Sequence, residues 1–381
     1  MVPTGVGFKC TTCTRSLPSR RELPPWSRPV AVAALVAMAG LAALTLLGGE
    51  GPDSSPDPAI AVTAGGPIER RVQIDGAGDV VIGGTLALPE AAGTGDTVSG
   101  VVIIPGFGPT TRDGVVPSGT VPDNLYSDLS ATLVGEGMAT FRYDKRGTGQ
   151  SVLPPDEPLR FDDMVADAAA AVSFMAERAE VDPQSIAVVG HEEGGLVALQ
   201  LAASESRVGR LVLVSVPGRP LIEVLSDDFN NSGHGDEVAT LQAVVGGLLA
   251  GQGLPEQGQL PPLLQGFFPA AQEGYLQELF ALDPVTVASR VDTPVLIVRG
   301  GAATGVSAAD SDALAAALGS HAEVVVAPGA GPTLRAVEAF AGEDSSNPMS
   351  SAHEHGASAP TVTAERDQDA MTAIADFLTE T

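Results

Sequence analysis

The sequence predicts an α/β fold in which helices flank a mostly parallel sheet. Apolar runs such as residues 100–105 and 210–216 are typical of strands buried on both faces of a parallel sheet. Segments with helical spacing separate these runs, and this alternation implies parallel strands joined by right-handed crossovers. A third observation is the pattern of residues 185–197, which predicts a strand, a sharp turn and a helix. The 381 residues suffice for one large α/β domain or two small ones.

The start of the chain differs in charge from the rest. Residues 1–48 hold five basic residues and one acidic residue, Glu22, so they carry +4 while the remainder carries −31. Residues 30–47 form an apolar run of 18 residues without a charge, which is about the length that spans a hydrocarbon core of roughly 30 Å. Because the basic residues precede this run, the positive-inside rule places the N-terminus in the cytoplasm and the body outside.

We therefore expect a cytoplasmic basic segment at residues 1–29, a single-pass transmembrane anchor at 30–48 and a linker at 49–67 rich in Pro, Asp, Ser and Gly. Cleavage of a signal peptide, which would release a secreted body, is the alternative. The 29 residues before the apolar run are long for a signal peptide, and residues 46–50 match a small-x-small cleavage site poorly. These two observations favour the uncleaved anchor.

The charge and the cysteines limit the classes of partner. A net charge of −27 argues against nucleic acid, because the body would repel the phosphate backbone. Such a charge is typical of a soluble surface in a salty medium or of an acidic face for a cationic partner. Cys10 and Cys13 lack the second pair that a structural zinc site needs, so we expect free thiols. His353 and His355 have no evident further ligands, and we expect neither a metal nor another cofactor.

The body is expected to begin at residue 68 and to run to residue 381. Asp162 and Asp163 in a first turn, followed by an Ala-rich stretch, favour a helix over residues 161–179. Residues 342–364 are small and polar, and we expect a mobile loop there. The expected strands are 68–74, 80–88, 100–105, 138–143, the strand that ends at Gly190, 210–216, 293–298 and 322–327, and the expected helices are 123–136, 161–179, the helix after the sharp turn, several pieces within 218–290, and 365–378.

The turn itself reads Gly190-His191-Glu192-Glu193-Gly194-Gly195. Its glycines are needed where strand and helix come so close that a β-carbon does not fit, and the central residue projects above the sheet. This turn resembles the nucleophile elbow Gly-His-Ser-Glu-Gly-Gly of the bacterial esterase-like and serine-aminopeptidase-like branch of the α/β-hydrolase superfamily. Residues 144–151, Asp-Lys-Arg-Gly-Thr-Gly-Gln-Ser, match the Asp-x-Arg-Gly-x-Gly-x-Ser turn of the same family, which is structural rather than catalytic.

The resemblance covers residues 68–381 and implies an α/β-hydrolase fold: an eight-stranded, mostly parallel sheet with flanking helices and a helical cap insertion at residues 218–290. It implies that Gly190, His191, Gly194 and Gly195 form the frame of the elbow. It also places one backbone N–H of an oxyanion hole at Phe107 or Gly108 and the other at Glu193. The positions of the catalytic serine, acid and histidine correspond to Glu192, Ala303 and Pro332.

These three residues differ from what acyl transfer requires. The reaction needs a hydroxyl nucleophile, an imidazole base and a carboxylate that orients it, and no catalytic residue is intact at the three positions. We therefore expect a pseudohydrolase that binds a small acyl or peptide ligand under the cap, or that regulates a partner. Two alternatives stay open: an active ester-, thioester- or amide-cleaving enzyme with a rewired site in which Glu192 is the nucleophile, and a structural envelope protein without a ligand.

Glu192 lies at a predicted helix N-terminus, beside two inward-pointing amide N–H groups. Such a place attracts anions. We expect its carboxylate to fold into the oxyanion hole, to stay ionised there and to block substrate carbonyls. A side chain in solvent, more than about 4 Å from the N–H groups of Phe107 and Gly108, would contradict this expectation.

Overall fold

The computed structural model describes residues 2–4, 7–9, 68–93, 97–115, 123–303, 305–338 and 361–380. The predicted anchor at residues 30–48, the linker, both cysteines and His353 and His355 lie outside these residues. Within the described ranges, no helix combines the length and the apolar character that crossing a bilayer requires.

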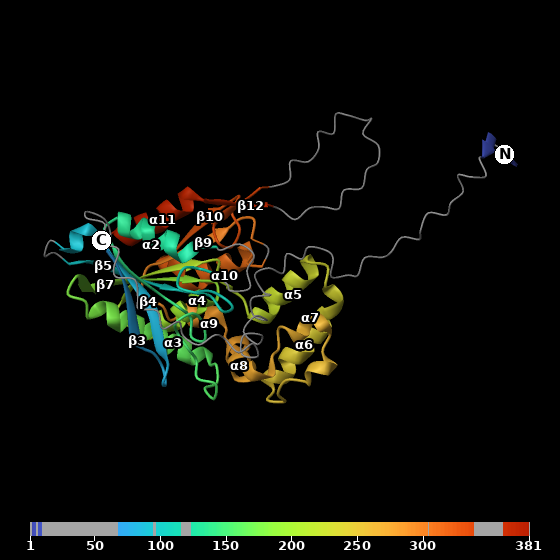
Figure 1. Ribbon diagram of the computed structural model, residues 1–381, viewed down its shortest axis with the longest axis horizontal. Coiled ribbons are helices and arrows are strands. Elements are labelled where there is room, and N and C mark those ends of the chain that lie inside the picture. The colour runs from blue at the N-terminus through green and yellow to red at the C-terminus, as the bar shows by residue number, and fades with distance from the viewer. Residues whose placement is uncertain are drawn as a thin grey trace, which may run out of the picture.

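The centre of the molecule is an eight-stranded sheet with the strand order β10-β9-β8-β7-β5-β6-β4-β3 (Figure 1). β4 pairs antiparallel with both β3 and β6, and all other neighbours are parallel. The prediction of an eight-stranded, mostly parallel sheet is therefore confirmed. The strands are β3 (Ile68–Asp75), β4 (Val81–Leu88), β5 (Val98–Ile104), β6 (Ala139–Tyr143), β7 (Val181–His191), β8 (Val208–Val214), β9 (Val295–Gly300) and β10 (Ala322–Ala327).

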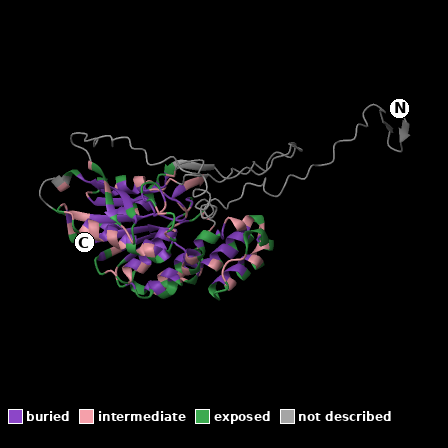
Figure 2. Cartoon of the chain, turned by 60° about the horizontal axis from the view of Figure 1, so that its bottom comes forward, coloured by how far each residue is buried: buried purple, intermediate pink, exposed green. Residues whose placement is uncertain are grey.

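Helices cover both faces of this sheet. On one face, α2 (Leu125–Gly135) and α11 (Gln368–Thr379) share a core with Val101 and Ile103 of β5. On the other, α3 (Phe161–Ala176), α4 (Glu193–Ala202) and α10 (Ala308–Leu318) share a core with Val102 and Ile104. Successive side chains of a strand point to opposite faces, so an uninterrupted apolar run feeds both cores. Figure 2 shows the resulting buried layer between the helices.

A run of helices stands between β8 and β9, and we call residues 221–288 the helical segment. Phe229 and Phe267 meet edge to face there, with 5.4 Å between ring centroids. Glu278 accepts a hydrogen bond of 2.7 Å from the Phe161 backbone N–H, which fixes the segment to the first residue of α3. The helices are α5 (Leu221–Asn231), α6 (Gly235–Leu249), α7 (Pro262–Gln265), α8 (Glu273–Ala281) and α9 (Pro284–Ala288), with 3-10 turns η5 (Gln257–Gln259) and η6 (Ala270–Gln272).

The C-terminal part differs from the prediction. β11 (Arg335–Glu338) and β12 (Thr361–Arg366) pair antiparallel, so residues 361–364, expected in a mobile loop, form a strand. The closing helix begins at Gln368 and not at residue 365, because the Asp367 side chain caps it by accepting the Ala370 N–H at 2.9 Å. Arg366 stays in the strand, where it forms an ion pair of 2.8 Å with Asp128 of α2.

Four further short elements were also not predicted. β1 (Val2–Thr4) and β2 (Gly7–Lys9) pair antiparallel near the N-terminus. The 3-10 turns η4 (Glu90–Gly93) and η7 (Gly319–His321) lie before β5 and β10.

Candidate functional site

The predicted sharp turn between strand and helix is present. β7 ends at His191, α4 begins at Glu193, and Glu192 between them has φ 48° and ψ −114°. A non-glycine residue with a positive φ is strained and persists where its surroundings enforce it, which is common at functional sites. The surroundings here are tight, because a Cβ atom on Gly190 would overlap the carbonyl oxygen of Gly194. The four residues of the predicted frame thus hold Glu192 in the raised position of an elbow.

The Glu192 side chain turns toward the Gly-rich loop that follows β5. It is only 13% exposed, and the Phe107 backbone N–H lies near enough to its carboxyl group to lower the pKa of that group in part. Its Oε2 atom lies 3.0 Å from the position that a Cβ atom on Gly106 would occupy. The carboxylate therefore does not point into solvent, which is the geometry that would have contradicted our expectation.

The burial of Glu192 opposes the expected ionisation of its carboxyl group. Burial raises the pKa of Glu192 above its ordinary value, while His191 and the Phe107 N–H lower it in part. Asp123 and Glu193 add negative charge nearby and raise it further. The site therefore favours the protonated carboxyl more than water does, because the loss of hydration outweighs the effect of the Phe107 N–H.

His191 is held by a chain of hydrogen bonds. The Gly106 N–H donates to the Tyr126 hydroxyl at 2.7 Å, this hydroxyl lies 3.0 Å from His191 Nδ1, and His191 Nε2 lies 3.2 Å from the Pro332 carbonyl oxygen. Because a carbonyl oxygen only accepts, we assign the proton of the neutral ring to Nε2, so that Nδ1 accepts from Tyr126. Both ring nitrogens are thus engaged, and His191 belongs to the frame of the elbow.

The residues expected at the positions of the acid and the histidine lie in two loops. Ala303 follows β9, and Pro332 follows β10. The two loops are joined by a hydrogen bond of 2.9 Å from the Ala302 N–H to the Ala330 carbonyl. Pro332 reaches the elbow through its carbonyl oxygen, which also accepts the Ser215 hydroxyl at 2.8 Å. The Pro332 loop therefore lies against the elbow, and neither Ala303 nor Pro332 supplies a carboxylate or an imidazole.

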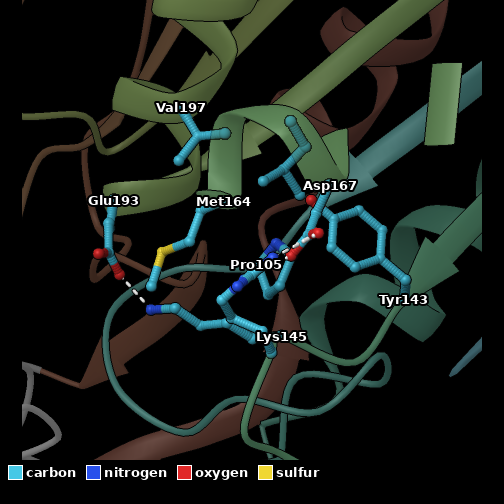
Figure 3. A pocket seen from close by; sticks show the side chains of 9 residues that line it. Pro105, Tyr143, Lys145, Met164, Asp167, Glu193 and Val197 are labelled. Atoms are coloured by element: carbon cyan, nitrogen blue, oxygen red, sulfur yellow. Dashed lines mark hydrogen bonds and ion pairs between the residues drawn. The ribbon is translucent and has the colours of Figure 1, made fainter. Parts of the chain in front are cut away.

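Sequence reasoning used Glu193 only for its backbone and missed its side chain. The carboxylate is fully buried and forms an ion pair with Lys145, as Figure 3 shows. Its other oxygen accepts the Tyr275 hydroxyl from α8 at 2.5 Å. Lys145 also donates to the Gly106 carbonyl at 3.1 Å. This group ties the elbow, the Gly-rich loop and the helical segment together. The sequence could have indicated that Glu193 has a cationic partner, because a carboxylate buried among apolar residues needs one. Nothing in the sequence pointed to Tyr275.

The turn at residues 144–151 has a structural role, as the resemblance implied. Asp144 accepts hydrogen bonds from the Arg112 backbone N–H at 2.8 Å and from the Gln150 N–H at 2.8 Å. The Ser151 hydroxyl is fully buried and donates to the Asp144 carbonyl at 2.7 Å. The turn thereby holds Arg112 and fixes the Gly-rich loop beside the elbow.

Across the described part of the chain, no group of three or more His, Cys, Asp or Glu side chains is arranged to hold a metal ion. The candidate site therefore consists of Glu192, whose carboxyl group lies near the Phe107 N–H, and of His191 with its hydrogen-bond partners.

Parts of the chain are similar to known proteins. Residues 123–222, which include the elbow, match the family model described as serine aminopeptidase, S33. Esterase EstD of Thermotoga maritima is 25% identical over 236 residues, which cover 61% of this chain and 51% of EstD. Polyketide transferase ATR5 of Stachybotrys chlorohalonatus is 30% identical over 88 residues, or 23% of this chain and 30% of ATR5. The chain thus spans about half, or less, of the length of these curated relatives.

Among solved structures, a hypothetical protein from Pseudomonas aeruginosa superimposes with a TM-score of 0.52 at 20% identity, over 74% of this chain and 91% of that protein. At this identity the likeness concerns the fold. Together with the sheet order, this likeness shows that the chain has the α/β-hydrolase fold. The matches to the serine aminopeptidase model and to EstD support an esterase-like branch of that superfamily.

Proposed function

We propose that this chain is a membrane-anchored, extracytoplasmic α/β-hydrolase-like protein that is catalytically impaired and acts by binding or regulation. One observation carries the proposal: Glu192 follows the strand at the centre of the elbow, and its side chain is only 13% exposed, with its carboxyl group near the Phe107 N–H. A substrate carbonyl would need this same N–H to stabilise its developing oxyanion. The protein's own side chain therefore competes with a substrate at the start of acyl transfer.

The rest of the site supports impairment. Ala303 and Pro332, at the other two positions, have no imidazole that could take the proton of a nucleophile or return it to a leaving group. In a serine hydrolase, loss of the serine or of the histidine lowers turnover by roughly 10⁶. His191 does not replace the missing base, because both of its ring nitrogens already have partners.

The anchor and the location rest on the first 48 residues. The apolar run at residues 30–47 and the basic residues before it favour a single-pass helix with the N-terminus in the cytoplasm. The ligand that we propose is a small acyl or peptide compound, since relatives with this elbow act on such compounds. The helical segment lies against the elbow through Tyr275 and is placed to limit access to it.

An active acyl hydrolase is the second candidate. The similarity to esterase EstD favours it, as does a distance of 4.0 Å between Glu192 Oε1 and His191 Nε2. In such a rewired site, the Glu192 carboxylate would attack the acyl carbon and expel the alcohol, and water would then cleave the resulting anhydride. This candidate predicts that Glu192→Gln abolishes hydrolysis.

The proposal is tested by assaying the full-length chain against a panel of activated short-chain esters. The Glu192→Ser, Ala303→Asp, Pro332→His triple variant is assayed in parallel. A silent wild type and a variant that gains turnover would support impairment at these three positions. Turnover by the wild type that Glu192→Gln removes would instead establish the second candidate.

A further inference from the structure

A groove of about 500 Å³ lies between α2 and α11, two helices that Figure 1 shows side by side. We call it the side groove. Sites for small molecules usually measure about 300–1,000 Å³, so the side groove has room for a ligand of this class. Two residues each of α2, β12 and α11 line it: Asp128, Thr132, Glu365, Arg366, Gln368 and Met371.

The guanidinium group of Arg366 is already used within the protein. Its Nε donates to the Asp128 carboxylate at 2.8 Å, and its Nη2 donates to the Asp123 carboxylate at 2.8 Å. Its Nη1 donates to the Thr333 carbonyl at 2.6 Å. The Arg366 side chain is only 4% exposed. An anion in the side groove would therefore meet a cation that is buried and already paired, which leaves the cost of its own desolvation uncompensated.

The other polar groups of the side groove offer acceptors. The Thr132 hydroxyl donates to the Asp128 main-chain carbonyl at 3.0 Å, so its lone pairs remain available. The Gln368 amide nitrogen donates to the Arg366 carbonyl at 3.3 Å, and the amide oxygen accepts no hydrogen bond from the described residues. The Asp128 side chain gives Oδ2 to Arg366 and stays 45% exposed. A ligand that donates hydrogen bonds therefore fits this lining.

The charge of the side groove favours a cation. Its lining holds two carboxylates, Asp128 and Glu365, against the guanidinium of Arg366. The whole chain carries −27, and such a field draws cations toward the surface. A Ca²⁺ ion takes about six to eight oxygen ligands at short distances, which is more than two carboxylates supply. An organic cation also uses the space, because the buried Met371 offers its flexible apolar chain.

We propose that the side groove binds a small primary ammonium compound whose short apolar chain lies against Met371. The ammonium group has three N–H donors. Their acceptors are the Asp128 carboxylate, the Thr132 hydroxyl and the Gln368 amide oxygen. This site goes beyond the proposed function, since no residue of the elbow or of the Gly-rich loop lines it.

The test uses the full-length chain labelled with ¹³C at its methionine methyl groups, of which the sequence has seven. The Met371 signal is assigned with Met371→Leu, and hexylammonium is titrated in. Hexanoate and 1-hexanol change the charge of the probe, and hexyltrimethylammonium keeps the charge without an N–H donor. We expect hexylammonium to shift the Met371 signal to saturation and each analogue to bind at least about tenfold more weakly, which corresponds to about 1.4 kcal/mol.

Two variants connect this binding to the acceptors. Asp128→Asn is expected to weaken hexylammonium binding at least about tenfold, and Gln368→Leu is the second variant should the first not fold. The matched control is Asp227→Asn in α5. Like Asp128, Asp227 is about half exposed and pairs at 2.8 Å with an arginine that has a second carboxylate partner, here Asp310. This control is expected to bind hexylammonium as the wild type does.

Three results would overturn the proposal: no saturable shift of the Met371 signal, equal affinity for any of the three analogues, or unchanged affinity in a folded Asp128→Asn or Gln368→Leu variant. Ester turnover by the wild type would refute the proposed impairment and leave the Met371 titration unaffected. The failure of one proposal is therefore distinguishable from the failure of the other.

Discussion

The Nε2–H of His191 donates a hydrogen bond to the carbonyl oxygen of Pro332, across 3.2 Å. Pro332 is the residue that we expect at the position of the catalytic histidine of relatives, and its loop contacts the elbow through the main chain. The Ser215 hydroxyl donates to the same oxygen at 2.8 Å. The loop after β10 therefore supports the shape of the elbow without supplying its chemistry.

The first prediction concerns the buried charge of Glu193 and its contribution to stability. Glu193→Gln would leave the Lys145 ammonium buried without its counter-charge, and such a loss costs about 3–5 kcal/mol of unfolding free energy. Urea denaturation measures this difference. The matched control is Glu205→Gln, which removes an ion pair with Arg207 that is largely at the surface and should cost no more than about 1 kcal/mol. Equal costs for the two variants would contradict the buried pair.

The second prediction concerns the hydroxyl of Tyr126. Tyr126→Phe would leave the buried Gly106 N–H without its acceptor and His191 Nδ1 without its donor, so we expect a loss of about 1–3 kcal/mol in unfolding free energy. Tyr143→Phe is the control, because Tyr143 is equally buried and its hydroxyl makes no hydrogen bond within the described residues. A cost for Tyr126→Phe no greater than that of the control would refute the hydrogen-bonded chain.

The third prediction concerns Gly190, the first glycine of the elbow. Gly190→Ala places a methyl group against the backbone of Gly194 and Gly195, which cannot move without opening the turn. We expect little folded protein, as judged by circular dichroism and thermal unfolding. Gly246→Ala in α6 meets nothing within 4 Å and should stabilise its helix by about 0.5–1 kcal/mol. A stable Gly190→Ala variant would mean that strand and helix are farther apart than described.

The fourth prediction concerns how the unfolding free energy depends on pH, and it follows from the raised pKa of Glu192. The folded state binds the proton more tightly than the unfolded state, whose ordinary pKa is 4.5. Stability therefore falls as the pH rises from this value through the higher pKa of the folded state. Glu192→Gln removes this loss, so its advantage in unfolding free energy over the wild type should be larger at about pH 8 than at about pH 4. Denaturation curves at both values measure it, and an advantage that shrinks with rising pH would contradict the burial of this carboxyl.

Most of the architecture follows from local patterns in the sequence. The buried strands appear as apolar runs, and the spacing of glycines around Glu192 predicts the elbow, because only a close approach of strand and helix requires them. The pairing of β11 with β12 was not predicted, since both strands are short and the 22 residues between them hide their relation. The start of α11 was misplaced because Glu365 and Arg366 fit a helical pattern equally well.

The site was only partly predictable for a related reason. The elbow is one continuous stretch, so its residues could be named from the sequence. Tyr275 meets Glu193 from a position 82 residues away, and Tyr126 meets His191 from 65 residues away. Such contacts depend on how the helices pack, and no local sequence pattern predicts them. The side groove belongs to the same class, because its Asp128 and Arg366 lie 238 positions apart in the sequence.

The most direct test of the central account compares the hydrolysis of an activated acetate ester by the purified full-length wild type and by Glu192→Gln. The account predicts that both release alcohol no faster than the buffer, because the Glu192 side chain occupies the place of the substrate carbonyl and both ring nitrogens of His191 have partners. Turnover by the wild type that disappears in Glu192→Gln would contradict it and would make Glu192 a catalytic residue.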